Sequence, residues 1–154
     1  MNLPAMLFTI AMAGSAFGAA EQQIPWQTSL EVAYKKATAT HRPLVVYYRG
    51  SDCEWCRRLD AEIDSAAPSI VAGAVWVRLN PDFDDAGGNA YRLAKALNLT
   101  RYPTVFVIRA MPDRVEEVGR VVGYKPHADW FAVVGDLIGG VSTPLTRAAR
   151  PRTP

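Results

Sequence analysis

The chain has 154 residues, of which 49% are hydrophobic and 21% are charged, and its net charge is +2 at neutral pH. This length is typical of one domain, and this composition is typical of a globular protein with a hydrophobic core. The small net charge and the interspersed signs argue against a nucleic-acid-binding surface. We therefore expect one globular unit that does not bind nucleic acid.

The two ends of the chain differ from the middle. Residues 1–20 carry no charged side chain, and the apolar stretch Leu7 to Ala13 is followed by small residues, a pattern typical of a cleaved signal peptide. The alternative is an uncleaved membrane anchor, although the segment is shorter than the roughly 20 apolar residues that span a bilayer. Both interpretations predict that the domain, residues 21–141, is exported. Residues 142–154 have little to bury and are expected to form a disordered tail.

Helical and strand patterns alternate along the middle of the chain. Thr28 and Glu31 have capping-box spacing and predict the start of a helix that ends near Thr40. Apolar or alternating runs predict four strands, the last one as an antiparallel partner of the third. These strands are Leu44 to Tyr48, Ala74 to Leu79, Thr104 to Ile108 and Val115 to Val122. Trp76 and Trp130 are expected to be core residues.

Three more helices are expected. One begins at or just after Cys53 and ends before Pro68, because its apolar residues share one helical face. Another covers Tyr91 to Leu97, and the last follows Pro126 and is closed by Gly139-Gly140. This order predicts an α/β domain with a mixed central sheet, helices on both faces, and a C-terminal antiparallel hairpin followed by a helix.

The only two cysteines, Cys53 and Cys56, form a C-x-x-C pair between a predicted strand and a predicted helix. A disulfide between them closes too small a loop to constrain the unfolded chain, so a structural staple is a poor explanation. A structural metal site usually needs about four ligands. The other candidate ligands, His41 and His127, have no paired spacing. We therefore favour redox chemistry and expect no bound metal.

The position of the pair gives the two cysteines different roles. Backbone N–H groups and the helix dipole favour a thiolate on Cys53, and the thiolate is the nucleophile in disulfide exchange. Cys56 lies one turn further, where it can attack a mixed disulfide and release the substrate. We expect Cys53 to attack and Cys56 to resolve, without a diffusible cofactor.

Four segments resemble the thioredoxin superfamily, and more closely its exported members that carry Gly-Ser-Asp before the redox pair. They are LVVYYRGSDCEWCRRLD, VWVRLNPD, ALNLTRYPTVFVI and EVGRVVGYKPHADWFAVV. The resemblance covers Leu30 to Ile138 and implies a thioredoxin fold. It also implies an exported thiol–disulfide oxidoreductase, located in the periplasm or otherwise exported, and we expect a monomer. Its partners would be protein thiols and disulfides, together with an upstream redox partner.

The resemblance also implies substrate-binding residues. The superfamily carries a cis-proline before the strand that faces the redox pair, and Pro103 matches it. The backbone of Tyr102 would then bind an extended substrate by strand addition. Trp55, between the cysteines, is either a substrate-contacting aromatic or a hydrophobic cover. Tyr47 is a departure, because thioredoxins proper have a buried aspartate there, and the proton-handling role of that aspartate does not transfer.

The charges around Cys53 oppose one another. Two acids would raise the pKa of its thiol and three arginines would lower it. They are Asp52, Glu54, Arg49, Arg57 and Arg58. The sequence therefore does not predict whether the protein oxidises, reduces or isomerises. An alternative function is a binding module, such as a chaperone or an accessory to copper or haem maturation, in which the thiols are secondary.

Overall fold

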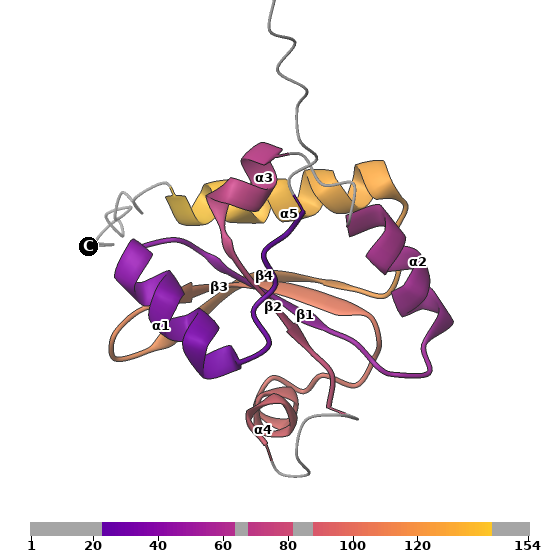
Figure 1. The fold of residues 1–154 in the computed structure, drawn as a ribbon, viewed down its shortest axis with the longest axis horizontal. Helices are drawn as coiled ribbons and strands as arrows, with labels where there is room; N and C mark the ends of the chain where they lie inside the picture. The colour runs from indigo at the N-terminus through magenta and orange to yellow at the C-terminus, as the bar shows by residue number, and fades with distance from the viewer. Residues whose placement is uncertain (1–22, 64–67, 82–87, 143–154) are drawn as a thin grey trace, which may run out of the picture.

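The computed structural model describes residues 23–63, 68–81 and 88–142 (Figure 1). The predicted signal peptide lies outside these residues, as does the predicted tail beyond its first residue. No helix in the described ranges is long and apolar enough to cross a bilayer.

Four strands form one sheet in the order β2-β1-β3-β4. They are β1 (Leu44–Tyr48), β2 (Val75–Leu79), β3 (Thr104–Ala110) and β4 (Val115–Val122). β1 and β2 are parallel, whereas β3 runs antiparallel to both β1 and β4. All five residues of β1 are buried, because β1 is a central strand with both faces covered. The predicted mixed sheet with a C-terminal antiparallel hairpin is confirmed.

Helices cover both faces of this sheet (Figure 1). One face packs against α2 (Glu54–Ile63), α3 (Pro68–Gly73) and α5 (His127–Ser142), and the other against α1 (Leu30–Thr40) and α4 (Asn89–Ala96). We call the core between the sheet and α2, α3 and α5 the first core, and the core on the α1 and α4 side the second core. Because side chains alternate along a strand, Val45 and Tyr47 of β1 lie in the first core and Val46 lies in the second. Trp76 and Trp130 are both buried in the first core and stack with ring centroids 6.5 Å apart, which confirms their prediction as core residues.

The start of α1 differs from the prediction. Ser29, not Thr28, is the N-cap, and its hydroxyl accepts a hydrogen bond from the N–H of Val32. Glu31 does not reach back to a cap, because its carboxylate pairs with Lys35 one turn further along the exposed face. The capping box is therefore wrong, while the predicted helix is correct.

The end of α5 also differs from the prediction. The helix does not stop at Gly139-Gly140 but continues to Ser142. A helical glycine costs about 1 kcal/mol relative to alanine, which packing can offset. Ile138 is buried in the core and Val141 packs against it, so the burial of this turn outweighs the two glycines.

Helix α3 was not expected from the sequence. Its six residues are too few to show a helical period, and it is held by tertiary contacts instead. Val71 is buried in the first core, and its carbonyl oxygen accepts a hydrogen bond from the Trp76 indole N–H at 3.1 Å.

Candidate active site

The site begins where β1 ends. The chain leaves β1 at Tyr48, and α2 begins at Glu54, directly after Cys53. The carbonyl oxygen of Cys53 accepts hydrogen bonds from the N–H groups of Cys56 and Arg57, each at 3.1 Å, so the first turn of α2 forms on Cys53. The predicted helix start is confirmed, and the sheet fixes the position of the C-x-x-C pair.

The two cysteines form a disulfide, with their Cα atoms 5.2 Å apart, and they differ in access. Cys53 is partly exposed, whereas Cys56 is completely buried. The Sγ atom of Cys53 also accepts a hydrogen bond from the backbone N–H of Cys56 at 3.1 Å. An N–H donor at a helix N-terminus stabilises negative charge on the outer sulfur. The geometry therefore presents one sulfur to a partner molecule and keeps the other behind it.

Tyr102 and Pro103 lie beside the loop that leads to Cys53. The Tyr102–Pro103 peptide bond is cis, as the resemblance implied. A Cβ atom on Gly50 would lie only 2.8 Å from the Tyr102 ring, and this ring packs against Tyr48 with centroids 5.1 Å apart. Tyr102 is 39% exposed. The fold thus brings this exposed ring from the start of β3 to the approach to the disulfide.

Trp55 is a surface residue with fixed neighbours. Its side chain is half exposed and stacks on Tyr124, with ring centroids 5.5 Å apart. The Arg58 guanidinium lies 4.7 Å from the Trp55 ring centroid. The Tyr124 hydroxyl in turn donates a hydrogen bond to Glu62 at 3.0 Å, which raises the pKa of Tyr124. These contacts favour an exposed aromatic platform over a hydrophobic cover.

The same residues connect both sides of the site. Tyr124 follows Gly123, whose N–H donates a hydrogen bond to the carbonyl oxygen of Pro103 at 2.8 Å. Trp55 on α2 and Pro103 at the start of β3 are therefore joined through the segment after β4. The three residues expected to bind substrate are thus linked by contacts, with Tyr102 and Trp55 exposed and Pro103 buried between their segments.

Several charges near Cys53 are paired with opposite charges. Glu54 accepts hydrogen bonds from Arg57 at 2.7 Å and Arg58 at 3.3 Å, and these arginines hold the pKa of Glu54 below its usual value. Arg49 pairs with Asp60, with Nη1 and Oδ2 2.7 Å apart. Each arginine that would lower the pKa of Cys53 therefore has an acidic partner, which reduces its net effect on the thiol.

A buried polar cluster lies behind the pair, around Tyr47. The Tyr47 side chain is completely buried, and its hydroxyl donates a hydrogen bond to the Cys56 carbonyl oxygen at 3.1 Å. Burial raises the pKa of Tyr47 well above its usual value, and the nearby Asp60 carboxylate adds to this effect. The position that holds an acid in thioredoxins proper therefore holds a phenol that stays protonated, and the acid near it, Asp60, lies on α2.

Sequence reasoning missed two members of this cluster, Asp60 and Arg78. Arg78 lies 3.8 Å from Asp60 and places its guanidinium 4.4 Å from the Trp26 ring centroid. One sequence signal pointed to Asp60: it lies four residues after Cys56, on a helical face whose other members are apolar. A charge on such a face has to find a partner inside the fold.

His41 lies away from this site. His41 is the C-cap of α1, before the start of β1, whereas the disulfide follows the other end of that strand. His127 is the first residue of α5. Within the described ranges, no three His, Cys, Asp or Glu side chains are grouped as a metal site requires.

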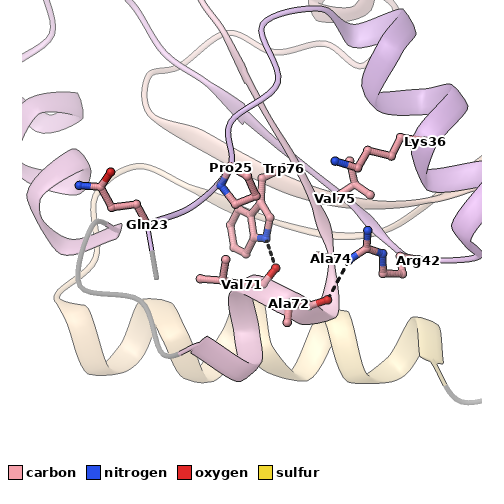
Figure 2. A pocket seen from close by; sticks show the side chains of 9 residues that line it. All are labelled: Gln23, Pro25, Lys36, Arg42, Val71, Ala72, Ala74, Val75 and Trp76. Atoms are coloured by element: carbon pink, nitrogen blue, oxygen red, sulfur yellow. Dashed lines mark hydrogen bonds between the residues drawn. The ribbon is translucent and has the colours of Figure 1, made fainter. Parts of the chain in front are cut away.

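A cavity of about 270 Å³ lies at the end of β1 opposite to the disulfide. Figure 2 shows Lys36, Arg42 and Trp76 among its lining residues. The Arg42 guanidinium and the Trp76 indole donate hydrogen bonds to the carbonyl oxygens of Ala72 and Val71. Both polar groups therefore already serve to hold α3, and none of the predicted site residues lines this cavity.

Solved structures with a similar arrangement identify the architecture. A thioredoxin from Thermus thermophilus is 19% identical, with a TM-score of 0.63, and the match covers 84% of this chain and 100% of that one. The fold is the thioredoxin fold. Thioredoxin O2 from Arabidopsis thaliana is also 19% identical, with a TM-score of 0.53 over 70% of this chain and 85% of that one. An oxidoreductase named DsbH is 16% identical, with a TM-score of 0.60 over 90% and 95% of the two chains.

The predicted thioredoxin fold is confirmed, and at these identities the likeness speaks for the fold alone. No protein-family model matches the sequence, and no curated protein matches it significantly. Support for the activity therefore comes from the geometry of the Cys53–Cys56 site.

Proposed function

We propose that the chain is an exported thiol–disulfide oxidoreductase that exchanges disulfides with protein substrates through Cys53 and Cys56. The observation that carries the proposal is the asymmetry of the pair. A partly exposed sulfur at the N-terminus of α2 is bonded to a buried sulfur and accepts a backbone N–H hydrogen bond. Disulfide exchange needs such an arrangement, with one accessible nucleophile and one internal resolving thiol.

The reaction follows from this arrangement. In the reduced protein, the Cys53 thiolate attacks a substrate disulfide, and one substrate sulfur leaves as a thiolate. Cys56 then attacks the Cys53 sulfur, which releases the second substrate thiolate and restores the internal disulfide. The oxidised pair runs the same steps in reverse, and an upstream redox partner resets it. The electrons reside on the two sulfurs, so no cofactor is required.

The surface around the disulfide supports a protein substrate. Trp55, between the cysteines, and Tyr102, which packs beside Gly50 on the approach to Cys53, both have exposed aromatic area. An extended segment would place its backbone along Tyr102 and its side chains against these rings. We assign substrate binding to these three residues.

Export to the periplasm is part of the proposal. Residues 1–20 have the composition of a signal peptide, and a disulfide is stable in an oxidising compartment. Cell fractionation of the full chain, together with the mass of the mature protein, distinguishes cleavage from anchoring. Size-exclusion chromatography with light scattering tests the proposed monomer.

Disulfide reduction of insulin tests the activity. Cys53→Ser should abolish it, and Cys56→Ser should accumulate mixed disulfides, because its substrate adducts cannot be resolved. Full activity of the Cys53→Ser protein would refute the proposal. A double cysteine-to-serine variant that retains its cellular function would show that the protein acts as a binding module instead.

The reduction potential of the Cys53–Cys56 couple determines the direction of exchange. A value of about −270 mV is that of a reductant such as thioredoxin, and about −120 mV is that of a strong oxidant. Equilibration with glutathione buffers measures this value.

A further inference from the structure

The resolving cysteine has a proton to lose. Cys56 is completely buried, and burial disfavours the charged form of a thiol. The thiolate is nevertheless the form that attacks the mixed disulfide. A proton acceptor close to Cys56 would therefore accelerate resolution.

Most of the nearby groups cannot fill this role. Tyr47 is closest to the Cys56 backbone, but its hydroxyl is already the donor to the Cys56 carbonyl oxygen, and burial keeps this phenol protonated. Glu54 is an exposed partner of two arginines, and Glu62 accepts the hydroxyl of Tyr124.

Asp60 differs from these groups in position and in bonding. It lies four residues after Cys56, and side chains at this spacing are neighbours on a helix, with Cβ atoms about 5–6 Å apart. Its side chain is only 20% exposed. Its Oδ2 atom pairs with Arg49, but its Oδ1 atom is buried and accepts no hydrogen bond from the described residues. This oxygen retains the capacity to accept a proton.

We propose that Asp60 is the proton acceptor for Cys56 when the mixed disulfide is resolved, an inference that rests on the proposed oxidoreductase function. The Cys56 S–H bond breaks, its proton passes to the Asp60 carboxylate, and the electron pair stays on sulfur. This sulfur attacks the Cys53 sulfur, so the internal S–S bond forms while the bond from Cys53 to the substrate breaks. The substrate leaves as a thiolate, and Asp60 releases its proton to solvent through its exposed edge.

Three neighbouring side chains prepare this carboxylate. Arg49, directly after β1, and Arg78, on β2, lie 2.7 Å and 3.8 Å from its oxygens and hold it beside the sheet. Tyr47, on β1, contacts the turn of α2 that carries Cys56 and keeps that turn on the sheet. These three face Asp60 from the sheet, so the carboxylate is held in place before resolution begins.

A symmetrical aromatic disulfide with a coloured thiolate product separates the two steps in the full-length reduced protein. The first equivalent is released when Cys53 attacks, and the second when Cys56 closes the internal disulfide. Asp60→Asn should leave the first release unchanged and slow the second by about a hundredfold, the lower range for general acid–base catalysis. The second release in this variant should also speed up with pH in proportion to hydroxide, because solvent then takes the proton.

Two control variants separate proton transfer from a structural role. Arg49→Gln breaks the same ion pair but keeps the carboxylate, so its second release should slow by less than that of Asp60→Asn and should not rise in proportion to hydroxide. Glu62→Gln removes an acid from the same helix and should have no effect on it. If Arg49→Gln slowed the second release as much as Asp60→Asn, the ion pair would matter and the proposal would be wrong.

The remaining outcomes are equally decisive. A second release with the same rate and pH dependence in folded Asp60→Asn and in the wild type would overturn the role of Asp60. If Asp60→Asn does not fold, the double variant Asp60→Asn/Arg49→Gln leaves the cluster with the same net charge and should show the same slow second release. Absence of the first release in the wild type would instead refute the oxidoreductase function itself.

Discussion

Replacing Tyr47 with phenylalanine removes one buried hydroxyl and leaves the ring in place. The lost group is the donor to the Cys56 carbonyl oxygen, at 3.1 Å, in a fully buried setting. Losing such a bond and leaving its acceptor without this donor costs about 1–2 kcal/mol. For a domain of this size, each kcal/mol corresponds to about 4 °C in Tm. We therefore expect Tyr47→Phe to lower the Tm of the oxidised protein by about 4–8 °C at neutral pH.

The same substitution changes the response to alkali. Burial raises the pKa of Tyr47 above its ordinary value of 10.0, so above that pH the unfolded chain loses the phenol proton while the folded chain retains it. The stability that this group contributes is complete below about pH 10 and is lost as the pH rises through the folded pKa. The slope reaches about 1.4 kcal/mol per pH unit. The phenylalanine variant lacks this slope, so the two stability curves should converge in alkali.

Urea unfolding of both oxidised proteins, at about pH 7 and about pH 10.5, measures both effects. Tyr91→Phe is the matched control, because Tyr91 is 55% exposed and its substitution should change the unfolding free energy by less than about 0.5 kcal/mol. Equal stability of Tyr47→Phe and the wild type near neutral pH would refute the hydrogen-bond argument. Parallel loss of stability in alkali would refute the argument from the raised pKa.

Two further substitutions test the surface and the charges of the site. Gly50→Ala places a methyl group about where the Tyr102 ring lies, 2.8 Å from it, so the exposed ring must move. Turnover of a protein disulfide should fall several-fold while reaction with a small aromatic disulfide stays unchanged, and equal effects on both would contradict substrate binding by Tyr102. Glu54→Gln removes an acid beside Cys53 and frees the two arginines paired with it, so the Cys53 thiolate should be stabilised. The reduction potential should therefore rise in glutathione equilibration, whereas Glu31→Gln on α1 should leave the potential unchanged.

The sequence determined much of the architecture because its signals are local. The continuous apolar run Leu44 to Tyr48, rich in Val and Tyr, predicted a strand covered on both faces, and it is the central strand β1. The face formed by Cys56, Leu59 and Ile63 fixed where α2 begins and which side it buries. Pro103 carried no local signal for a cis bond, and the resemblance to a known superfamily supplied that expectation.

Local signals failed where packing opposed them. The glycines at 139 and 140 are typical helix terminators, yet the packing of Ile138 and partly buried Val141 keeps α5 helical beyond them. The six residues of α3 have no detectable period, and their helix depends on Val71 and Trp76, which meet only in the folded protein. In both cases contacts between distant residues outweighed the preference of the segment itself.

The electrostatics of the site shows the same division. The sequence placed five charges around Cys53 without indicating which would act, because the effect of a charge depends on distance and on its partner. The tertiary structure decided this by pairing Glu54 with its own helix and Arg49 with Asp60. It also brought Tyr47 and Arg78, which are 31 residues apart, to one carboxylate behind Cys56. Periodicity along the chain fixes which element a residue belongs to, whereas the partner of a buried charge is fixed only when strands and helices meet.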